Sequence, residues 1–473
     1  MKSGNKHNRN LLIATYIFLA VFVGLIAYLI YFTVHDADGV INNTYNKRQD
    51  ILSEKVVKGS ILSSDGEILA QTVTDEEGNE TRYYPYANVF SHVIGYLNNG
   101  GYGLENNACY YMLSSNENPF EKIVKDLKDE KLSGDNVVTT LNAQLQQIAY
   151  NALGSNRGAV IVTEPSTGKI LAMVSKPDFN PNTLADNWDA ITAEGGDSVL
   201  VNRATQGLYP PGSTFKIVTL LEYIRENPLT YKSYSYDCTG AFDLDGTIIN
   251  CVQNTAHGTE DTALSFAYSC NSSFINMGLT LDIESYKKTA EELLFNSELP
   301  LDMEYNRSSF SLTEDSSLWE KAVTSFGQGN TLITPMHLAL IGSAIANGGV
   351  LMKPLLMDHI ENVNSTTVKK FRSSVYGKMM SEDEAEILRE NLENVINTSF
   401  GWLFGDCEYT VAGKSGTAQY GTLGYEHSLF VSFSPAQNPE ICVTVVVEGG
   451  EQRTCSAAEI ARVIYDYYYT NMR

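Results

Sequence analysis

The sequence predicts an α+β protein whose larger domain, residues 141–473, is an antiparallel sheet built from both ends of that domain, with helices inserted between them. The segment 158–175, "GAVIVTEPSTGKILAMVS", reads as two strands joined by a Pro-Ser-Thr-Gly turn. The segment 428–450, "SLFVSFSPAQNPEICVTVVVEGG", reads as two more strands around a Pro/Asn turn, and 456–472 reads as a closing helix. The stretch between the two strand pairs is rich in helical patterns.

The N-terminus has the pattern of a membrane anchor. The tail, residues 1–10, carries three basic residues and no acidic one, and no charged residue occurs from Leu11 to Val34. As a helix these 24 residues span about 36 Å, more than a hydrocarbon core of about 30 Å. A cleaved signal peptide is the alternative, but the apolar run exceeds a signal h-region and no small-x-small cleavage site follows it. We therefore predict a cytoplasmic tail over 1–10 and a transmembrane helix over 11–34, with the rest on the outer side of the cell membrane.

The exported part of the chain is acidic. Without the three basic residues of the tail it carries 30 Lys and Arg against 56 Asp and Glu. This balance argues against nucleic acid as a partner and against broad electrostatic binding to an anionic membrane. The acidity is consistent with solubility and does not identify a substrate.

Residues 35–140 are predicted to form a smaller, β-rich module. The segment 56–72, "VVKGSILSSDGEILAQT", alternates β-branched residues with turn signals and reads as a hairpin. No convergent set of acids or nucleophiles is evident in this module, so we expect a stalk or docking pedestal of the dimerisation-module type. The larger domain opens where Thr140 or Asn142 can cap a helix that starts near Ala143.

The first chemical motif is "YPPGSTFKIVTLLEYI", in which two prolines and a glycine precede Ser213 and an apolar helix. Lys216 lies three residues on, on the same helix face. A serine becomes a nucleophile when a base takes its proton, and a lysine can be that base if burial or a like charge lowers its pKa. The helix dipole would also favour an oxyanion beside the Ser213 N–H group. Because S-x-x-K alone is common by chance, this motif indicates a nucleophilic serine only in combination with further motifs.

The second motif is "YSCNSSF", which contains Ser269 and Asn271. A second hydroxyl can relay a proton between the lysine and a leaving group, and an amide can hold a substrate carbonyl. In isolation this triplet carries almost no information.

The third motif, "VAGKSGTAQY", reads as an edge strand. Lys414 and Ser415 offer a cation and a hydroxyl for a carboxylate or for proton relay. Gly416 leaves room for a substrate backbone to lie along the strand, and the Thr417 N–H group is a candidate second oxyanion donor.

Taken in order, STFK, SCN and KSG match the motif set of penicillin-binding proteins. The chain resembles the class B (monofunctional) penicillin-binding proteins, the D,D-transpeptidases of peptidoglycan synthesis, over nearly its whole length. "KGSILSSDGEILA", "GYGLE" and "FGQGNTLITPMHLALIGSAIANGG" are further landmarks. The resemblance implies the penicilloyl-serine transferase fold, stem peptides as substrates and inhibition by β-lactams. The two departures, Cys270 within the second motif and Ser415 for threonine in the third, remove no needed functional group.

The resemblance also implies residue roles. Ser213 is the nucleophile that is acylated, and Lys216 is its base. The other implied roles are proton relay for Ser269, acyl-donor binding for Asn271, relay for Lys414, and substrate binding for Ser415, Gly416 and Thr417.

A second cluster of chemically active residues is spaced as C-x12-C-x5-H-x12-C; its members are Cys238, Cys251, His257 and Cys270. Three interpretations stay open. The ligand types fit a structural zinc site, an exported domain favours a disulfide, either Cys238–Cys251 or Cys251–Cys270, and buried free thiols are the third. Metal is favoured because some penicillin-binding proteins similarly carry ligands in this region. The catalysis itself requires no cofactor.

Two other functions compete with cross-linking. A D,D-carboxypeptidase or β-lactamase would use the same serine with water as acceptor, but no Glu-bearing motif clearly supplies a lactamase base. A sensor would need a signalling part, for which ten cytoplasmic residues leave no room. The resemblance implies a polytopic SEDS-family glycan polymerase as partner, since we find no glycosyltransferase domain. His427 and Cys442 are expected to be structural.

Overall fold

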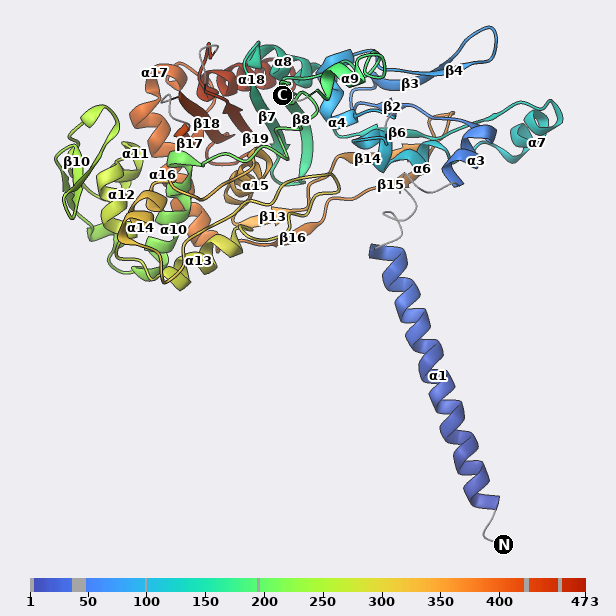
Figure 1. Ribbon diagram of the computed structural model, residues 1–473, viewed down its shortest axis with the longest axis horizontal. Helices are drawn as coiled ribbons and strands as arrows, with labels where there is room; N and C mark the ends of the chain where they lie inside the picture. Colours follow the sequence, from blue (N-terminus) through green and yellow to red (C-terminus); the bar gives the residue numbers. More distant parts are fainter. Residues whose placement is uncertain (1–3, 36–47, 98–99, 194–195, 421–424, 450–452) are drawn as a thin grey trace.

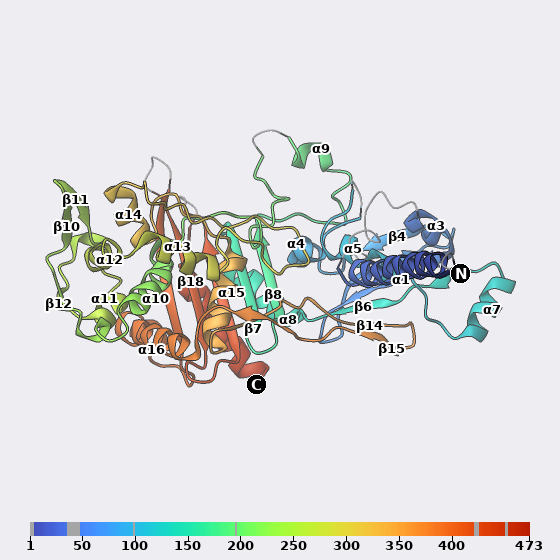
Figure 2. The same ribbon diagram turned by 90° about the horizontal axis from the view of Figure 1, so that it is seen from below.

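The computed structural model describes residues 4–35, 48–97, 100–193, 196–420, 425–449 and 453–473. Beyond the N-terminal helix the chain forms an elongated body (Figures 1 and 2). One end is a small β-rich pedestal and the other is a larger domain of a sheet and many helices.

The central sheet of the larger domain confirms the predicted antiparallel arrangement. Its strand order is β17-β18-β19-β7-β8, and every neighbouring pair is antiparallel. The strands are β7 (Gly158–Glu164), β8 (Lys169–Lys176), β17 (Ala412–Tyr420), β18 (Tyr425–Ser434) and β19 (Ile441–Val447). Both chain ends therefore build it, and β17, which carries the third motif, is an edge strand.

Helices cover both faces of this sheet. The helices α8 (Ala143–Leu153) and α18 (Ala457–Asn471) pack on one face, and α15 (Pro335–Ala346) packs on the other. Alternate side chains of one strand point to opposite faces. Accordingly, Val443 and Val445 enter the core beneath α8 and α18, whereas Cys442 and Val446 enter the core beneath α15. Cys442 is thus a core residue, as expected.

The inserted region between β8 and β17 is mainly helical and carries two of the three motifs. Its helices in the larger domain are α10 (Lys216–Glu226), α11 (Thr262–Ala267), α12 (Asn271–Gly278), α13 (Ile283–Glu292), α14 (Leu318–Ser325), α15, α16 (Glu382–Ser399) and α17 (Gly401–Phe404). Its small strand pairs are β9 (Tyr236–Cys238) with β12 (Gly258–Glu260), β10 (Ala241–Leu244) with β11 (Thr247–Asn250), and β13 (Val350–Met352) with β16 (Val375–Lys378).

The pedestal is built around a six-stranded sheet of order β15-β14-β6-β2-β3-β4. Four strands come from the N-terminal module: β2 (Ile61–Leu62), β3 (Ile68–Thr74), β4 (Glu80–Tyr83) and β6 (Asn136–Thr139). The predicted hairpin is the β2–β3 pair. The other two strands, β14 (Met357–Glu361) and β15 (Thr367–Lys370), come from inside residues 141–473. The predicted boundary at 140 therefore does not divide the molecule into two consecutive units, because strands this short do not specify their partners in sequence.

A second, two-stranded sheet joins β1 (Val56–Val57) to β5 (Leu132–Ser133). The short helices outside the larger domain's core are α3 (Arg48–Lys55), α4 (Ser91–Ile94), α5 (Leu104–Asn107), α6 (Cys109–Met112), α7 (Pro119–Leu127) and α9 (Trp188–Ile191).

The N-terminal helix α1 (Gly4–His35) contains an apolar span from Leu11 to Phe32 that is long enough to cross a membrane. Its side chains in that span are not buried against the rest of the molecule. The length and composition of α1 support membrane anchoring, in agreement with the segment predicted over 11–34.

Candidate active site

The three motifs meet around Ser213. This serine lies in a 3₁₀ turn, Gly212–Phe215, which continues directly into α10. It therefore lies at the N-terminal end of this helical segment, where the motif places it. Lys216 still lies three residues on and is fully buried, and its Nζ atom is 3.2 Å from Ser213 Oγ.

The surroundings of Lys216 suit a neutral amine. Its Nζ donates to the backbone oxygen of Ser269 at 2.6 Å and to Asn271 Oδ1 at 2.8 Å. A neutral amine has two N–H groups and one lone pair, so these acceptors can take both hydrogens and leave the lone pair for the Ser213 hydroxyl. Burial lowers the pKa of Lys216 to about 7, although nearby groups, Cys270 first among them, oppose part of this shift.

A second lysine reaches the same place from β17. Lys414 is fully buried, and its Nζ donates to Ser269 Oγ at 2.9 Å. Burial, together with the like charge of Lys216, holds the pKa of Lys414 well below its ordinary value. Lys216 Nζ lies 3.2 Å from the same hydroxyl, so Ser269 Oγ lies between the two amines. The backbone of Ser269 is left-handed, with φ of 57°, a strained conformation that commonly marks functional sites.

Three glycines bring the Ser213 turn against β17. A Cβ atom on Gly212, whose φ is 53°, would lie 2.6 Å from Thr417 O, and one on Gly327 would overlap Gly212 O. A Cβ atom on Gly416 would lie 2.7 Å from Pro211 O. The absence of a side chain at Gly416 therefore allows this close contact between the turn and the strand.

The strand β17 presents its remaining motif residues to the exterior. Ser415 is half-buried and Thr417 is exposed, and they share one face of the strand. Gln328 donates from Nε2 to Thr417 O at 3.3 Å. Sequence reasoning assigned Gln328 no role, although the "FGQG" turn that holds it was recognisable as a landmark. His427 is buried, accepts from the Gly449 N–H at 3.1 Å and so has the structural surroundings expected of it.

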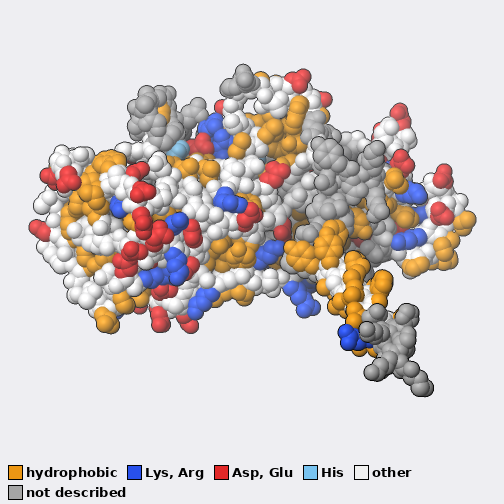
Figure 3. Space-filling model, turned by 60° about the horizontal axis from the view of Figure 1, so that its bottom comes forward, with side chains coloured by type: hydrophobic (Ala, Val, Ile, Leu, Met, Phe, Trp, Pro, Cys, Tyr) orange, Lys and Arg blue, Asp and Glu red, His pale blue; other side chains and the backbone are white. Residues whose placement is uncertain are grey.

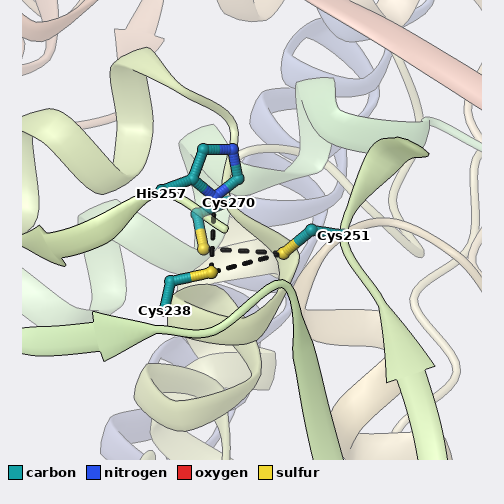
Figure 4. A group of neighbouring side chains, drawn as sticks. All are labelled: Cys238, Cys251, His257 and Cys270. Atoms are coloured by element: carbon teal, nitrogen blue, oxygen red, sulfur yellow. Dashed lines mark hydrogen bonds between the residues drawn. The ribbon is translucent and has the colours of Figure 1, made fainter. Parts of the chain in front are cut away.

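The structure also gathers the predicted Cys/His cluster (Figure 4). One donor atom from each of Cys238, Cys251, His257 and Cys270 lies within 4.8 Å of the others. Adjacent donors are 3.7 Å apart for Cys238 and Cys251 Sγ, 3.8 Å for Cys251 and Cys270 Sγ, and 3.4 Å for Cys238 Sγ and His257 Nδ1. None of the seven cysteines, all of which lie in the described part of the chain, forms a disulfide bond in the structure.

The sulfur atoms of this cluster differ in their surroundings. Hydrogen bonds, first from Cys270 and then from Ser272, lower the pKa of Cys251 below its ordinary value, although burial opposes this shift. Metal ions bind the thiolate form of a cysteine, which a lowered pKa favours. Cys270 also caps α12 by accepting from the Ser273 N–H at 3.4 Å, so the cluster and the second motif share one residue.

The chain is similar to known proteins over most of its length. A family model described as the penicillin binding protein transpeptidase domain matches residues 158–466. The chain is 29% identical to a peptidoglycan D,D-transpeptidase PbpA of Mycolicibacterium smegmatis, over 91% of this chain and 92% of that protein. It is also 27% identical to a peptidoglycan D,D-transpeptidase MrdA of Acinetobacter baumannii, over 83% and 66% of the two chains. A crystal structure of a D,D-transpeptidase domain from Eggerthella lenta superposes with a TM-score of 0.78, at 29% identity, over 88% of this chain and 99% of that one. The ceftriaxone acyl-enzyme of Mycobacterium tuberculosis penicillin-binding protein A superposes with a TM-score of 0.79, at 26% identity, over 88% and 99%.

Proposed function

This chain belongs to the class B penicillin-binding proteins, and from that premise we propose that it is a peptidoglycan D,D-transpeptidase that cross-links stem peptides through an acyl-enzyme on Ser213. The observation that carries this assignment is the position of the buried Lys216 amine, 3.2 Å from Ser213 Oγ. The hydrogens of this amine are directed to Ser269 O and Asn271 Oδ1, which leaves its lone pair for the Ser213 hydroxyl.

In the first step, Ser213 Oγ attacks the carbonyl carbon of the penultimate D-Ala, and its proton passes to Lys216 Nζ. The tetrahedral oxyanion forms beside the backbone N–H groups of Ser213 and Thr417. The C–N bond to the terminal D-Ala then breaks. The leaving amine takes a proton from Ser269 Oγ, which regains one from Lys216. The products are an ester on Ser213, a neutral lysine and free D-Ala.

In the second step, an amine of a neighbouring stem peptide attacks the ester. Lys216, through Ser269, accepts the proton that this amine loses, and returns a proton to the leaving Ser213 oxygen. Lys414 holds the Ser269 hydroxyl in position for both transfers. Asn271 binds the acyl-donor amide, and Ser415, Gly416 and Thr417 of β17 bind the donor backbone along the edge of the sheet.

Labelled penicillin tests this function against the hydrolytic alternative. We expect the purified protein to form one covalent adduct per chain that persists for many minutes after free drug is removed. A carboxypeptidase or lactamase would transfer the acyl group to water instead. Rapid loss of label with accumulation of hydrolysed penicillin would therefore contradict a transpeptidase and favour a hydrolase.

The acylation rate should depend on pH through Lys216. Its pKa in the folded protein is about 7, against 10.5 ordinarily, and the neutral form is the active base. The rate should therefore rise about tenfold per pH unit below 7 and level off above about pH 8. Stopped-flow measurement of penicillin acylation from pH 5 to 9 checks this profile. Lys216→Arg should be inactive throughout, because its guanidinium stays protonated; a flat or falling wild-type profile would contradict Lys216 as base.

We further propose a structural zinc ion bound by Cys238, Cys251, His257 and Cys270. With Zn–S of about 2.3 Å and Zn–N of about 2.0–2.1 Å, a tetrahedral site has S···S edges of about 3.8 Å and S···N edges of about 3.6 Å. The three donor pairs described above lie at 3.7, 3.8 and 3.4 Å, close to these edges. All four donors lie within 4.8 Å of one another, so small side-chain shifts would bring them onto the ion. When bound, the ion would supply rigidity and no chemistry; it would hold Cys270 and so fix Ser269 and Asn271 on either side.

Two proposals concern the cellular setting. We propose that α1 crosses the membrane with its N-terminus inside, since the basic residues precede the apolar span, so that the active site lies outside.

We also propose a SEDS-family glycan polymerase as partner, because cross-linking needs a supply of nascent strands. Co-purification of the two proteins from detergent extracts would check this partner.

A further inference from the structure

The pedestal helix α7 has its polar and apolar faces reversed. Beside the half-buried Val124, the apolar side chains Phe120, Ile123 and Leu127 recur at three- and four-residue spacing and therefore form one stripe. They are 72%, 59% and 82% exposed, and no residue of the helix is buried. A surface helix of a globular protein normally turns such a stripe toward the core.

The opposite face of α7 is attached to the pedestal by its lysines. Lys122 Nζ donates to Ser115 O at 2.6 Å, and Lys125 Nζ donates to Glu117 Oε1 at 2.6 Å. The Glu117 side chain is almost fully buried. These polar contacts hold the helix so that the apolar stripe points away from the protein. The stripe is therefore presented to something outside the described chain.

Through β5, α7 is connected to α3, the first described element after the membrane anchor. Its C-terminus leads within five residues to β5, whose Leu132 pairs with Val56 of β1, directly after α3. Lys131, just before β5, donates to Ser53 O of α3 at 2.9 Å. The apolar span of α1 ends at Phe32, so the 15 residues before Arg48 reach at most about 50 Å. Figure 1 places α3 and α7 together at the pedestal end, and Figure 3 shows hydrophobic side chains gathered at that same end.

We propose that α7 is an interfacial helix that lays its Phe120–Ile123–Leu127 stripe on the lipid surface and so sets the pedestal against the membrane. This proposal rests on the anchoring by α1 proposed above. Three side chains are too few for a stable protein interface, which uses about 20–30 residues a side. A lipid surface needs no shape complementarity, and the α1 tether keeps the helix close to it, so a small apolar area suffices.

The charged residues beside the stripe predict how α7 should respond to the charge of the lipid headgroups. The exposed acidic residues Glu121 and Asp126 flank the stripe, whereas Lys122 and Lys125 are engaged inward. Attachment should therefore depend on apolar contact and be nearly the same on zwitterionic and anionic lipid. This differs from a basic helix, which requires anionic headgroups.

Photo-crosslinking of the full chain in lipid nanodiscs tests the proposal. Benzoylphenylalanine would replace Ile123, or Leu229 as a control that is 95% exposed in the larger domain, or Phe22 within α1. We expect a lipid adduct at position 123 about tenfold more abundant than at 229, in both phosphatidylcholine and phosphatidylglycerol discs. Because these side chains are exposed, the substitutions leave the fold intact, and penicillin labelling confirms this for each variant.

The other outcomes overturn the proposal in distinguishable ways. A lipid adduct at 22 without one at 123 would show that α1 is anchored but α7 is free of lipid. Loss of both would contradict the anchoring itself. A cross-link from 123 to a second copy, or in cells to a polytopic protein instead of lipid, would make the stripe a protein interface. A requirement for phosphatidylglycerol would contradict an apolar mode of attachment.

Discussion

Replacing Ser213 with alanine should abolish covalent labelling by penicillin, with a loss in acylation rate of at least about 10³-fold. The ester of the proposed acyl-enzyme forms on Ser213 Oγ, and alanine has no atom that can form it. The substitution removes one oxygen next to Gly212 without disturbing the contacts of Lys216 to Ser269 and Asn271. Intact-mass measurement after incubation with penicillin reads out the adduct directly, and peptide mapping of the wild type locates it.

Ser233→Ala is the matched control, because Ser233 also lies in a 3₁₀ turn but is exposed and bonds only locally, to Thr230 O. This variant should acylate like the wild type. The competing nucleophile is Ser269, whose hydroxyl is also 3.2 Å from Lys216 Nζ. We assign Ser269 to relay because Lys414 holds the same hydroxyl at 2.9 Å. An adduct that persists in Ser213→Ala, or that maps to Ser269, would contradict the assignment.

The chemical groups of the site could be predicted from sequence because each motif is local. STFK, SCN and KSG specify which side chains are available, and the structure brings Lys216 and Lys414 each within hydrogen-bonding distance of the Ser269 hydroxyl. The contacts that assemble them could not be predicted, because they are long-range. Gly212, Gly327 and Gly416 each look like ordinary turn or strand glycines, and only packing shows that they make room for one another.

The same limit explains the pedestal. A strand of four or five residues such as β14 has the same pattern whichever sheet it joins, so its pairing with β6 was not foreseeable. The pattern of 119–127 is that of any amphipathic surface helix. Only the hydrogen bonds of Lys122 and Lys125 show that its polar face is the inner one.

Removing one ligand from the Cys/His cluster should reduce zinc binding, thermal stability and the acylation rate together. Cys251→Ser should lower bound zinc from about one per chain to nearly none, because Cys251 is the sulfur that lies against both Cys238 and Cys270. Structural zinc contributes about 10–16 kcal/mol in small zinc peptides. Even a fraction of that in this larger domain should lower Tm by about 5 °C or more. Acylation should also slow by about tenfold or more, since Cys270 lies between Ser269 and Asn271 and both must hold their positions around Lys216.

Cys407→Ser is the matched control, because Cys407 is half-buried and outside the cluster, and it should retain both zinc and the wild-type Tm. Elemental analysis of protein purified without chelator, together with a thiol count after denaturation, separates the three interpretations of the cluster. Zinc near one per chain with seven thiols supports the metal site. Five thiols without zinc would mean a disulfide, and seven thiols without zinc would mean free cysteines. In either of those cases the rigidity of the Ser269–Asn271 segment would have to come from packing alone, and the loss of acylation in Cys251→Ser would be correspondingly small.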